Sequence, residues 1–153
     1  MTAEPLDKLV AKHPFCKGLP PDAVALITGC AENVRYDRGA ILFRDGEEAD
    51  STYLIRAGRV ALDVHGVEAA ETAEEGDIMG WSWLFPPYKW HFTARAVTPV
   101  RAFRLDGTCL RNKCEADPAF GYEITRRMLY QVHRRLERSR LHRMDVYGGT
   151  ETP

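Results

Sequence analysis

The 153-residue sequence lacks long hydrophobic runs and an excess of charge of either sign. No stretch of about 18 consecutive apolar residues occurs, so no membrane-spanning helix is expected. The formal net charge is −1, which argues against a nucleic-acid partner for the chain as a whole. The N-terminus has no basic segment followed by an apolar one. We therefore expect no signal peptide, no membrane association and a cytoplasmic protein.

Metal-binding and catalytic patterns are also missing. The 4 cysteines include no Cys-x-x-Cys pair, and the 5 histidines include no His-x-His pair. Structural zinc usually requires four convergent ligands from two close pairs, and no nucleophile is grouped with a base along the chain. We expect buried, reduced thiols, no metal, no resident cofactor and no enzymatic activity. The cysteines are Cys16, Cys30, Cys109 and Cys114.

Glycine-containing turns recur through the middle of the chain, and short apolar or alternating runs lie between them. The expected strands are residues 40–43, 51–56, 60–64, 92–96 and 100–105. Many short strands separated by glycine turns indicate an antiparallel sandwich or barrel. No long helix separates these strands, which disfavours a doubly wound α/β fold.

Helical patterns flank the strands on both sides. Pro5 and Pro20-Pro21 suit the first turns of two short N-terminal helices. After the strands, Gly107 opens one helix and Asp117-Pro118 opens a longer one, with Asp117 as its candidate cap. The apolar spacing continues to about Met144, which predicts roughly 25 residues of helix, or about 38 Å.

Several short segments together carry a resemblance to a known family. These segments are His13-Pro14-Phe15, Gly18-Leu19-Pro20, Gly39 to Phe43, Gly46, Tyr53-Leu54-Ile55, Gly58, Val60, Gly80, Leu84 and Phe85. With the order of helices and strands, they resemble the cyclic-nucleotide-binding domain over residues 13–146. This domain is the sensor module of catabolite-activator-type regulators, protein kinase A regulatory subunits and gated channels.

The resemblance implies an α+β fold: an eight-stranded antiparallel, jelly-roll-like β-roll with N-terminal helices and a long C-terminal helix. We expect one domain over residues 1–147, a flexible tail over 148–153 and no DNA-binding domain. Alternating apolar residues on two expected strands should fill the roll interior. These residues are Tyr53, Ile55, Val60, Leu62 and Val64.

In the family, a glutamate binds the ribose hydroxyl and an arginine pairs with the cyclic phosphate, within one cassette of the roll. The resemblance places Trp81 at the glutamate position and Trp90 at the arginine position. A neutral indole cannot form a charge-assisted hydrogen bond, which contributes about 1.5–3 kcal/mol. Two such losses correspond to roughly hundredfold to ten-thousandfold weaker binding. We therefore do not expect an ordinary cAMP site.

The cassette still supplies a set of candidate ligand-binding residues for a cyclic nucleotide or another planar anion. These candidates are Gly80, Trp81, Ser82, Trp83, Leu84, Lys89, Trp90, His91, Phe92 and Thr93. Lys89 or His91 could contact the phosphate, or both could be solvated without a ligand. We expect Arg95 to be an outward strand residue.

Six aromatic residues fall within twelve positions of this segment. They are Trp81, Trp83, Phe85, Tyr88, Trp90 and Phe92. Three interpretations stay open: the rings plug the vacated pocket, they stack on a different planar ligand, or they form an exposed protein-binding patch.

Seven arginines and three acidic residues lie between Gly121 and Asp145. The arginines could be a solvated face paired with Glu137, a partner-protein contact or a nucleic-acid contact. In related transcription factors the corresponding helix forms a dimer coiled coil. We expect a homodimer here, packed through Ile124, Met128, Val132 and Leu136.

The sequence thus predicts a stand-alone, ligand-sensing regulatory module with an altered pocket. The alternative is a protein-interaction or scaffold module whose pocket is plugged by its own aromatic residues.

Overall fold

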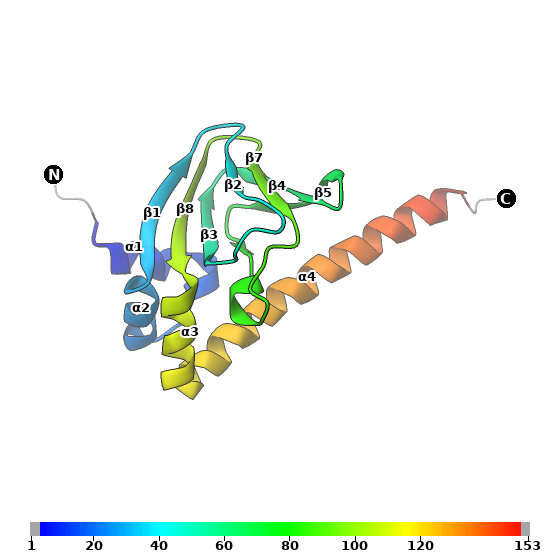
Figure 1. Ribbon diagram of the computed structural model, residues 1–153. Helices are drawn as coiled ribbons and strands as arrows, with labels where there is room; N and C mark the ends of the chain where they lie inside the picture. The colour runs from blue at the N-terminus through cyan, green and yellow to red at the C-terminus, as the bar shows by residue number, and fades with distance from the viewer. Residues whose placement is uncertain (1–3, 151–153) are drawn as a thin grey trace.

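A computed structural model describes the backbone of residues 4–150 and the side chains of residues 4–141. The N-terminal part contains α1 (Leu6–Lys12), the 3-10 helix η1 (Pro14–Cys16) and α2 (Pro21–Thr28). The C-terminal part contains α3 (Gly107–Ala116) and α4 (Pro118–Thr150). The helix α4 runs diagonally beneath the strands, and its second half extends beyond them (Figure 1).

Eight antiparallel strands form two four-stranded sheets, which confirms the predicted fold class. The first sheet has the order β1-β8-β3-β6, from β1 (Ala31–Tyr36), β8 (Val100–Asp106), β3 (Ser51–Ala57) and β6 (Ile78–Met79). The second has the order β2-β7-β4-β5, from β2 (Ile41–Phe43), β7 (Thr93–Ala96), β4 (Arg59–Val64) and β5 (Val67–Glu74). The edge strand β5 therefore pairs only with β4.

Alternation along the first sheet creates two separate cores. On β8, Val100 and Ala102 face the interior between the sheets, which we call the roll core. Phe103 and Leu105 of the same strand join a second cluster with the helices, which we call the helical core. Tyr53, Ile55, Val60 and Leu62 lie in the roll core as predicted, whereas Val64 is only partly buried.

His13 ties the N-terminal segment to the first sheet. The backbone N–H of Phe15 donates to its Nδ1 at 3.1 Å, so Nε2 carries the proton and donates to the Ile55 carbonyl at 2.8 Å. Burial lowers the pKa of His13 below 6.5, although the hydrogen bond to the Ile55 backbone opposes that change. The neutral ring is therefore the form that fits.

The prediction of reduced thiols is wrong for two of the four cysteines. Cys30, just after α2, and Cys109, in the first turn of α3, form a disulfide with their Cα atoms 5.7 Å apart. The two residues are 79 positions apart, so only the packing of α2 against α3 brings them together. Cys16 and Cys114 are free, and burial raises the pKa of Cys16 to about 12.

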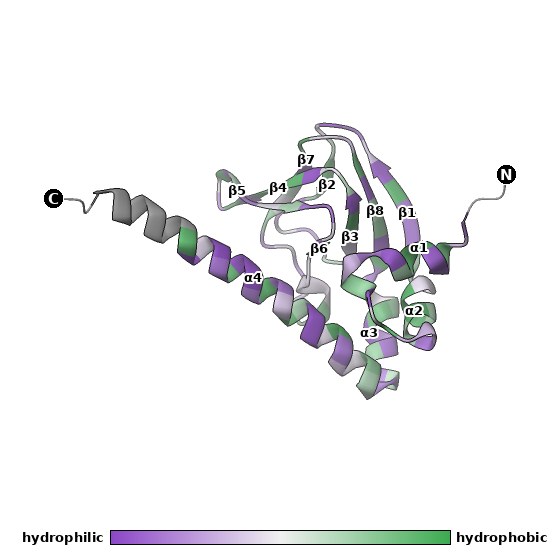
Figure 2. Cartoon of the chain, turned by 180° about the vertical axis from the view of Figure 1, so that it is seen from behind, coloured by the Kyte–Doolittle hydropathy of each residue, from purple (hydrophilic) through white to green (hydrophobic). Residues whose placement is uncertain are grey.

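Asp117 caps α4 as expected, since its carboxylate accepts from the Phe120 N–H at 3.2 Å. The helix continues to Thr150, past the expected end near Met144. Figure 2 shows hydrophilic and hydrophobic residues interleaved along it.

Candidate functional site

The cassette segment between β6 and β7 is held at both ends by hydrogen bonds to its backbone, from a threonine hydroxyl at the start and from other backbone groups at the end. At its start, the Thr52 hydroxyl donates to the carbonyls of Met79 (3.0 Å) and Gly80 (2.7 Å). At its end, the Trp90 N–H donates to the Glu47 carbonyl at 2.9 Å, and the Trp90 carbonyl accepts from the Gly46 N–H at 2.9 Å. Between them lies η2 (Ser82–Leu84). The backbone of Trp90 is therefore fixed against the turn at Gly46 and Glu47.

Trp90 fills space inside the roll. Its side chain is 1% exposed and stacks on Phe43, with ring centroids 3.7 Å apart and planes 12° apart. Phe92 contacts both rings edge-on, and Tyr53 stacks on the other side of the cluster. A Cβ atom at Gly80 would lie 2.7 Å from the Trp90 ring, so glycine is what permits this close approach. Gly80, Phe43, Tyr53 and Phe92 thus form the wall of a slot that Trp90 occupies.

The other cassette indoles face the helical core. Trp83 is fully buried, and its Nε1–H donates to the Gly80 carbonyl at 3.2 Å. The carbonyl of Trp83 accepts from Arg111 at 2.6 Å, which joins η2 to α3. Trp81, which the sequence led us to expect at the family's glutamate position, is only partly buried, and the Arg135 guanidinium lies 5.1 Å from its ring centroid.

The remaining candidate residues do not gather around one point. Ser82 is buried and Leu84 partly buried on the helical side, whereas Lys89 and His91 are exposed. Thr93 accepts from the Asp45 N–H at 3.0 Å. The structure brings together Gly80, Trp90 and Phe92, and it places Lys89 and His91 outside the roll core. Phe43 and Tyr53 complete the slot; their apolar positions on expected strands were the only sequence signal for them.

Arg95 forms an ion pair with Asp63 of β4 at 3.2 Å, as an outward strand residue can. A hydrogen bond from the Ala69 backbone N–H and, after it, this pair keep the pKa of Asp63 below its ordinary value. The side chain of Arg95 is therefore engaged on the outside of the second sheet.

Two of the α4 arginines bind backbone carbonyls of their own chain. Arg127 donates to the carbonyls of Phe15 (2.7 Å) and Lys17 (2.9 Å). Arg135 is only 9% exposed and donates to the Ile78 carbonyl at 3.2 Å, and burial lowers its pKa. Sequence reasoning missed both roles, because an arginine-rich helix carries no signal for which guanidinium is buried.

The residues expected on a dimer face divide between two environments. Ile124 and Met128 are buried in the helical core of their own chain, so these two cannot form an exposed seam. Val132 is half-buried and Leu136 is exposed. The exposed apolar residues spaced by seven along α4 are instead Tyr122, Leu129 and Leu136.

Within the described residues, no group of three or more histidines, cysteines or carboxylates is placed to hold a metal ion. No helix in the described part of the chain is long and apolar enough to cross a membrane.

Comparison with known sequences identifies relatives of this architecture. A family profile described as "Cyclic nucleotide-binding domain" matches residues 33–117. A "CRP-like cAMP-activated global transcriptional regulator" of Mycobacterium tuberculosis is 28% identical over 138 residues, which cover 88% of this chain and 60% of the regulator. The chain thus spans about 60% of the length of this curated relative.

Solved structures agree with the same fold. A protein from Geobacter metallireducens GS-15 described as a cyclic nucleotide-binding protein is similar with a TM-score of 0.78 and 26% identity, over 88% of this chain and 99% of that one. The sensor domain of the transcriptional regulator DNR from Pseudomonas aeruginosa is similar in fold, with a TM-score of 0.67 and 21% identity, over 86% and 91%. Since the profile match takes in more than half of the sequence, the chain belongs to the cyclic nucleotide-binding domain family.

Proposed function

We propose that this chain is a regulatory module of cyclic-nucleotide-binding fold whose roll is plugged by Trp90, and which acts through the exposed face of α4. The observation that carries the proposal is the position of Trp90, buried in the roll core and stacked on Phe43. The position that supplies a cation in the family supplies an apolar ring here. No catalytic step forms part of the proposed function.

Two free-energy costs oppose an ordinary cyclic nucleotide. A buried indole removes roughly 150–250 Å² from water, so moving Trp90 out of the roll costs about 4–6 kcal/mol on area bookkeeping. The ligand would then enter a roll core without the charged partners that Trp81 and Trp90 replace, since Lys89 and His91 are exposed. The expected result is binding too weak to measure at micromolar concentrations of cAMP.

The exposed face of α4 supports a role in assembly. Tyr122, Leu129 and Leu136 are exposed apolar residues at intervals of seven, the spacing of one position in a coiled-coil heptad. We propose that a second copy of this helix packs against them. Val132 and Leu136 then keep the role expected from the sequence, while Tyr122 and Leu129 replace Ile124 and Met128.

Calorimetric titration with cAMP and cGMP tests the plugged roll. The native protein should show no saturable heat, whereas a variant combining Trp90→Arg and Trp81→Glu should gain nucleotide binding, provided its circular dichroism shows a folded roll. Phe85→Ala, which truncates an exposed ring of the same segment, is the matched control and should behave as the native protein does. Saturable, micromolar binding of cAMP to the native protein would contradict the proposal.

A second function is favoured by the stacking geometry itself. The slot between Phe43 and Gly80 holds a planar ring at 3.7 Å from Phe43, so another planar molecule could occupy it if Trp90 moved outward. Such a ligand-sensing module should shift the Trp90 fluorescence to the red when adenine or another planar heterocycle binds. A compound that stabilises the protein without that red shift would indicate a binding site elsewhere in the molecule.

A further inference from the structure

A groove of about 780 Å³ lies between α4 and the N-terminal 3-10 helix η1. Its lining joins Pro14 and Phe15 of η1 to a stretch of α4 that runs from Arg126 to Arg134. None of the lining residues belongs to the cassette segment or to the roll core, so the groove is separate from the slot that Trp90 occupies. Small-molecule sites typically have volumes of about 300–1,000 Å³, and the groove is therefore large enough for an organic ligand.

Apolar side chains from both elements contribute to this lining. Phe15 is 5% exposed, and Pro14 beside it lies at the surface. Leu129 and Tyr130 of α4 are 67% and 59% exposed, although both are large. A ligand with an apolar body would cover these side chains and remove their surface from water, which is favourable.

The charged part of the lining is basic. Arg126, Arg127 and Arg134 line the groove with His133, and none of the described lining residues carries a carboxylate. Arg126 and Arg127 both pair with Glu123, each at 2.9 Å. Arg134 is exposed and forms no ion pair with any side chain among residues 4–141. The charge of Arg134 is thus the one left for a ligand, and it matches a single negative charge.

The groove follows the helix axis, which sets the shape of a fitting ligand. Arg126 and Arg134 are two turns of α4 apart, or about 12 Å at the usual rise per residue. The exposed Leu129 and Tyr130 lie between them in the sequence. A ligand whose anionic end reaches Arg134 would therefore run along apolar side chains for the rest of its length. This arrangement favours an elongated molecule with one anionic end over a compact anion.

We propose that this groove binds a monocarboxylate with an extended apolar chain, of the kind found in medium-chain fatty acids. The Arg134 guanidinium donates two parallel hydrogen bonds to the carboxylate. The chain covers Pro14, Leu129 and Tyr130, so that the ligand contacts η1 and α4 together. This site is independent of cyclic-nucleotide binding in the roll.

Calorimetric titration with sodium decanoate, kept below the concentration at which it forms micelles, tests the site. The native protein should give a saturable heat. Arg134→Gln should weaken binding roughly tenfold to hundredfold, because it removes charge-assisted hydrogen bonds. Tyr130→Ser should also weaken binding, since it removes an apolar ring from the lining. Both residues are exposed, so neither substitution should unfold the protein, which circular dichroism checks.

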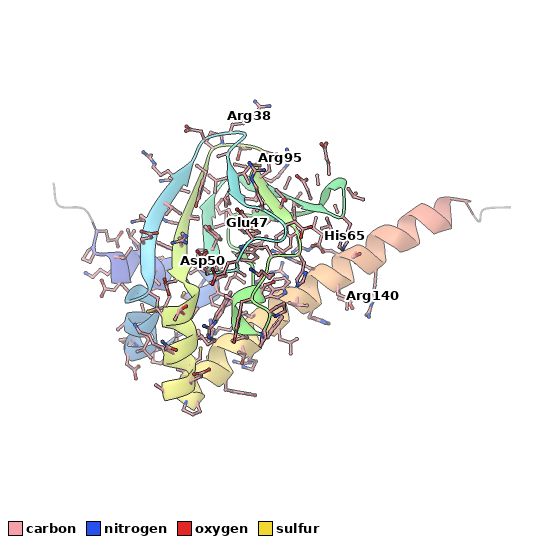
Figure 3. All side chains as sticks on the ribbon, in the orientation of Figure 1. Arg38, Glu47, Asp50, His65, Arg95 and Arg140 are labelled. Carbon is pink, nitrogen blue, oxygen red and sulfur yellow. A yellow bond between two sulfur atoms is a disulfide. The ribbon has the colours of Figure 1, made fainter. Side chains whose placement is uncertain are left out.

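Arg140→Gln is the matched control. Arg140 pairs with Glu137 and extends from α4 away from the strands, as Figure 3 shows. Its removal changes the net charge as Arg134→Gln does, and decanoate binding should survive. Two further compounds test the parts of the ligand: decan-1-ol lacks the carboxylate, and acetate lacks the chain. Each should bind at least about tenfold more weakly than decanoate.

Equal weakening in Arg134→Gln and Arg140→Gln would overturn the proposal, because it would assign binding to the general positive charge of α4. The absence of a saturable heat with the native protein would also overturn it, as would equally tight binding of decan-1-ol.

The outcome of this test is distinct from the plugged roll and from the proposed dimer. The groove shares no residue with the Trp90 slot, and of the exposed heptad face it includes only Leu129. Sedimentation equilibrium of Arg134→Gln should therefore give the same mass as the native protein. A failure to bind decanoate leaves both other proposals untouched.

Discussion

The roll core and the helix α4 differ in how fully their buried groups find partners in the folded chain. In the roll core, aromatic and aliphatic side chains pack together, and the Trp90 ring lies directly on Phe43. On α4, by contrast, Arg135 and Gln131 each keep one buried polar atom without a hydrogen-bond partner among the described residues. The comparison shows that apolar packing fills the centre of the roll, whereas the helix beside it carries buried polar atoms that lack a partner among those residues.

Trp90→Ala should have the largest effect on stability, because it removes the ring that fills the roll core. Truncating a buried large aromatic costs about 3–5 kcal/mol in free energy of unfolding. Urea denaturation measures the change, with Phe85→Ala on the same segment as the control, expected to cost less than about 1 kcal/mol. A loss as small as that of the control would show that the ring is not packed in the roll.

The disulfide should give an effect of similar size on the helical side. By the chain-entropy argument, closing a loop across 79 positions stabilises the folded protein by about 4 kcal/mol. Unfolding with and without a reductant should therefore differ in the native protein, but not in a variant combining Cys30→Ser and Cys109→Ser. Cys114→Ser, which leaves the bond intact, should stay sensitive to reduction. Equal stability with and without reductant in the native protein would contradict the bond.

A smaller effect on stability should follow from protonating His13. This change weakens the attachment of the N-terminal segment to the first sheet and leaves the roll core unchanged. Because burial lowers the folded-state pKa of His13, the unfolded chain binds its proton first as the pH falls. The free energy of unfolding is thus retained above pH 6.5. It decreases as the pH drops below 6.5, until the folded protein also takes up the proton. The slope is at most about 1.4 kcal/mol per pH unit.

Urea denaturation at pH 7.5 and pH 5.5 measures this dependence, and His13→Gln should flatten it. The ordinary pKa values of Asp63 and Glu123 are already below 5, and the folded protein lowers them further. The stability that these two carboxylates contribute is therefore lost only at more acidic pH. An unchanged slope in His13→Gln would assign the dependence to other groups.

The smallest effect on stability is expected from Leu129→Glu on the exposed face of α4. Folding of the monomer should change by less than about 0.5 kcal/mol, because the side chain makes few contacts in its own chain. The proposed dimer should dissociate, which sedimentation equilibrium measures as a shift toward the monomer mass. Thr108→Glu, at an exposed position on α3, is the control and should leave the mass unchanged. A native protein that is monomeric at high concentration would sink the proposed dimer.

Sequence patterns predicted those parts of the fold in which apolar spacing and turn residues agree. The flanking helices and five strands are present where the alternation and the glycine turns indicated. β1, β5 and β6 were not among the expected strands, for local reasons. β1 and the largely exposed edge strand β5 carry little apolar alternation, and β6 has two residues.

The candidate site was predicted less completely, because its residues depend on packing between distant segments. The sequence led us to expect Trp81 and Trp90 in place of the family's charged residues, but it did not predict the direction in which each ring points. Likewise, the spacing of Ile124 and Met128 fits burial within the chain as well as a dimer seam, and only the fold decides. The burial of Arg135 against Ile78 brings together residues 57 positions apart, which no local pattern records.

The most direct test of the plugged roll is the environment of Trp90 in solution. A variant with Trp81→Phe and Trp83→Phe leaves Trp90 as the single tryptophan, so its emission and its quenching by acrylamide report on that ring alone. We predict a blue-shifted emission with little quenching, and we expect that an excess of cAMP leaves both unchanged. A red-shifted, readily quenched emission, or a shift to that state on adding cAMP, would contradict the account.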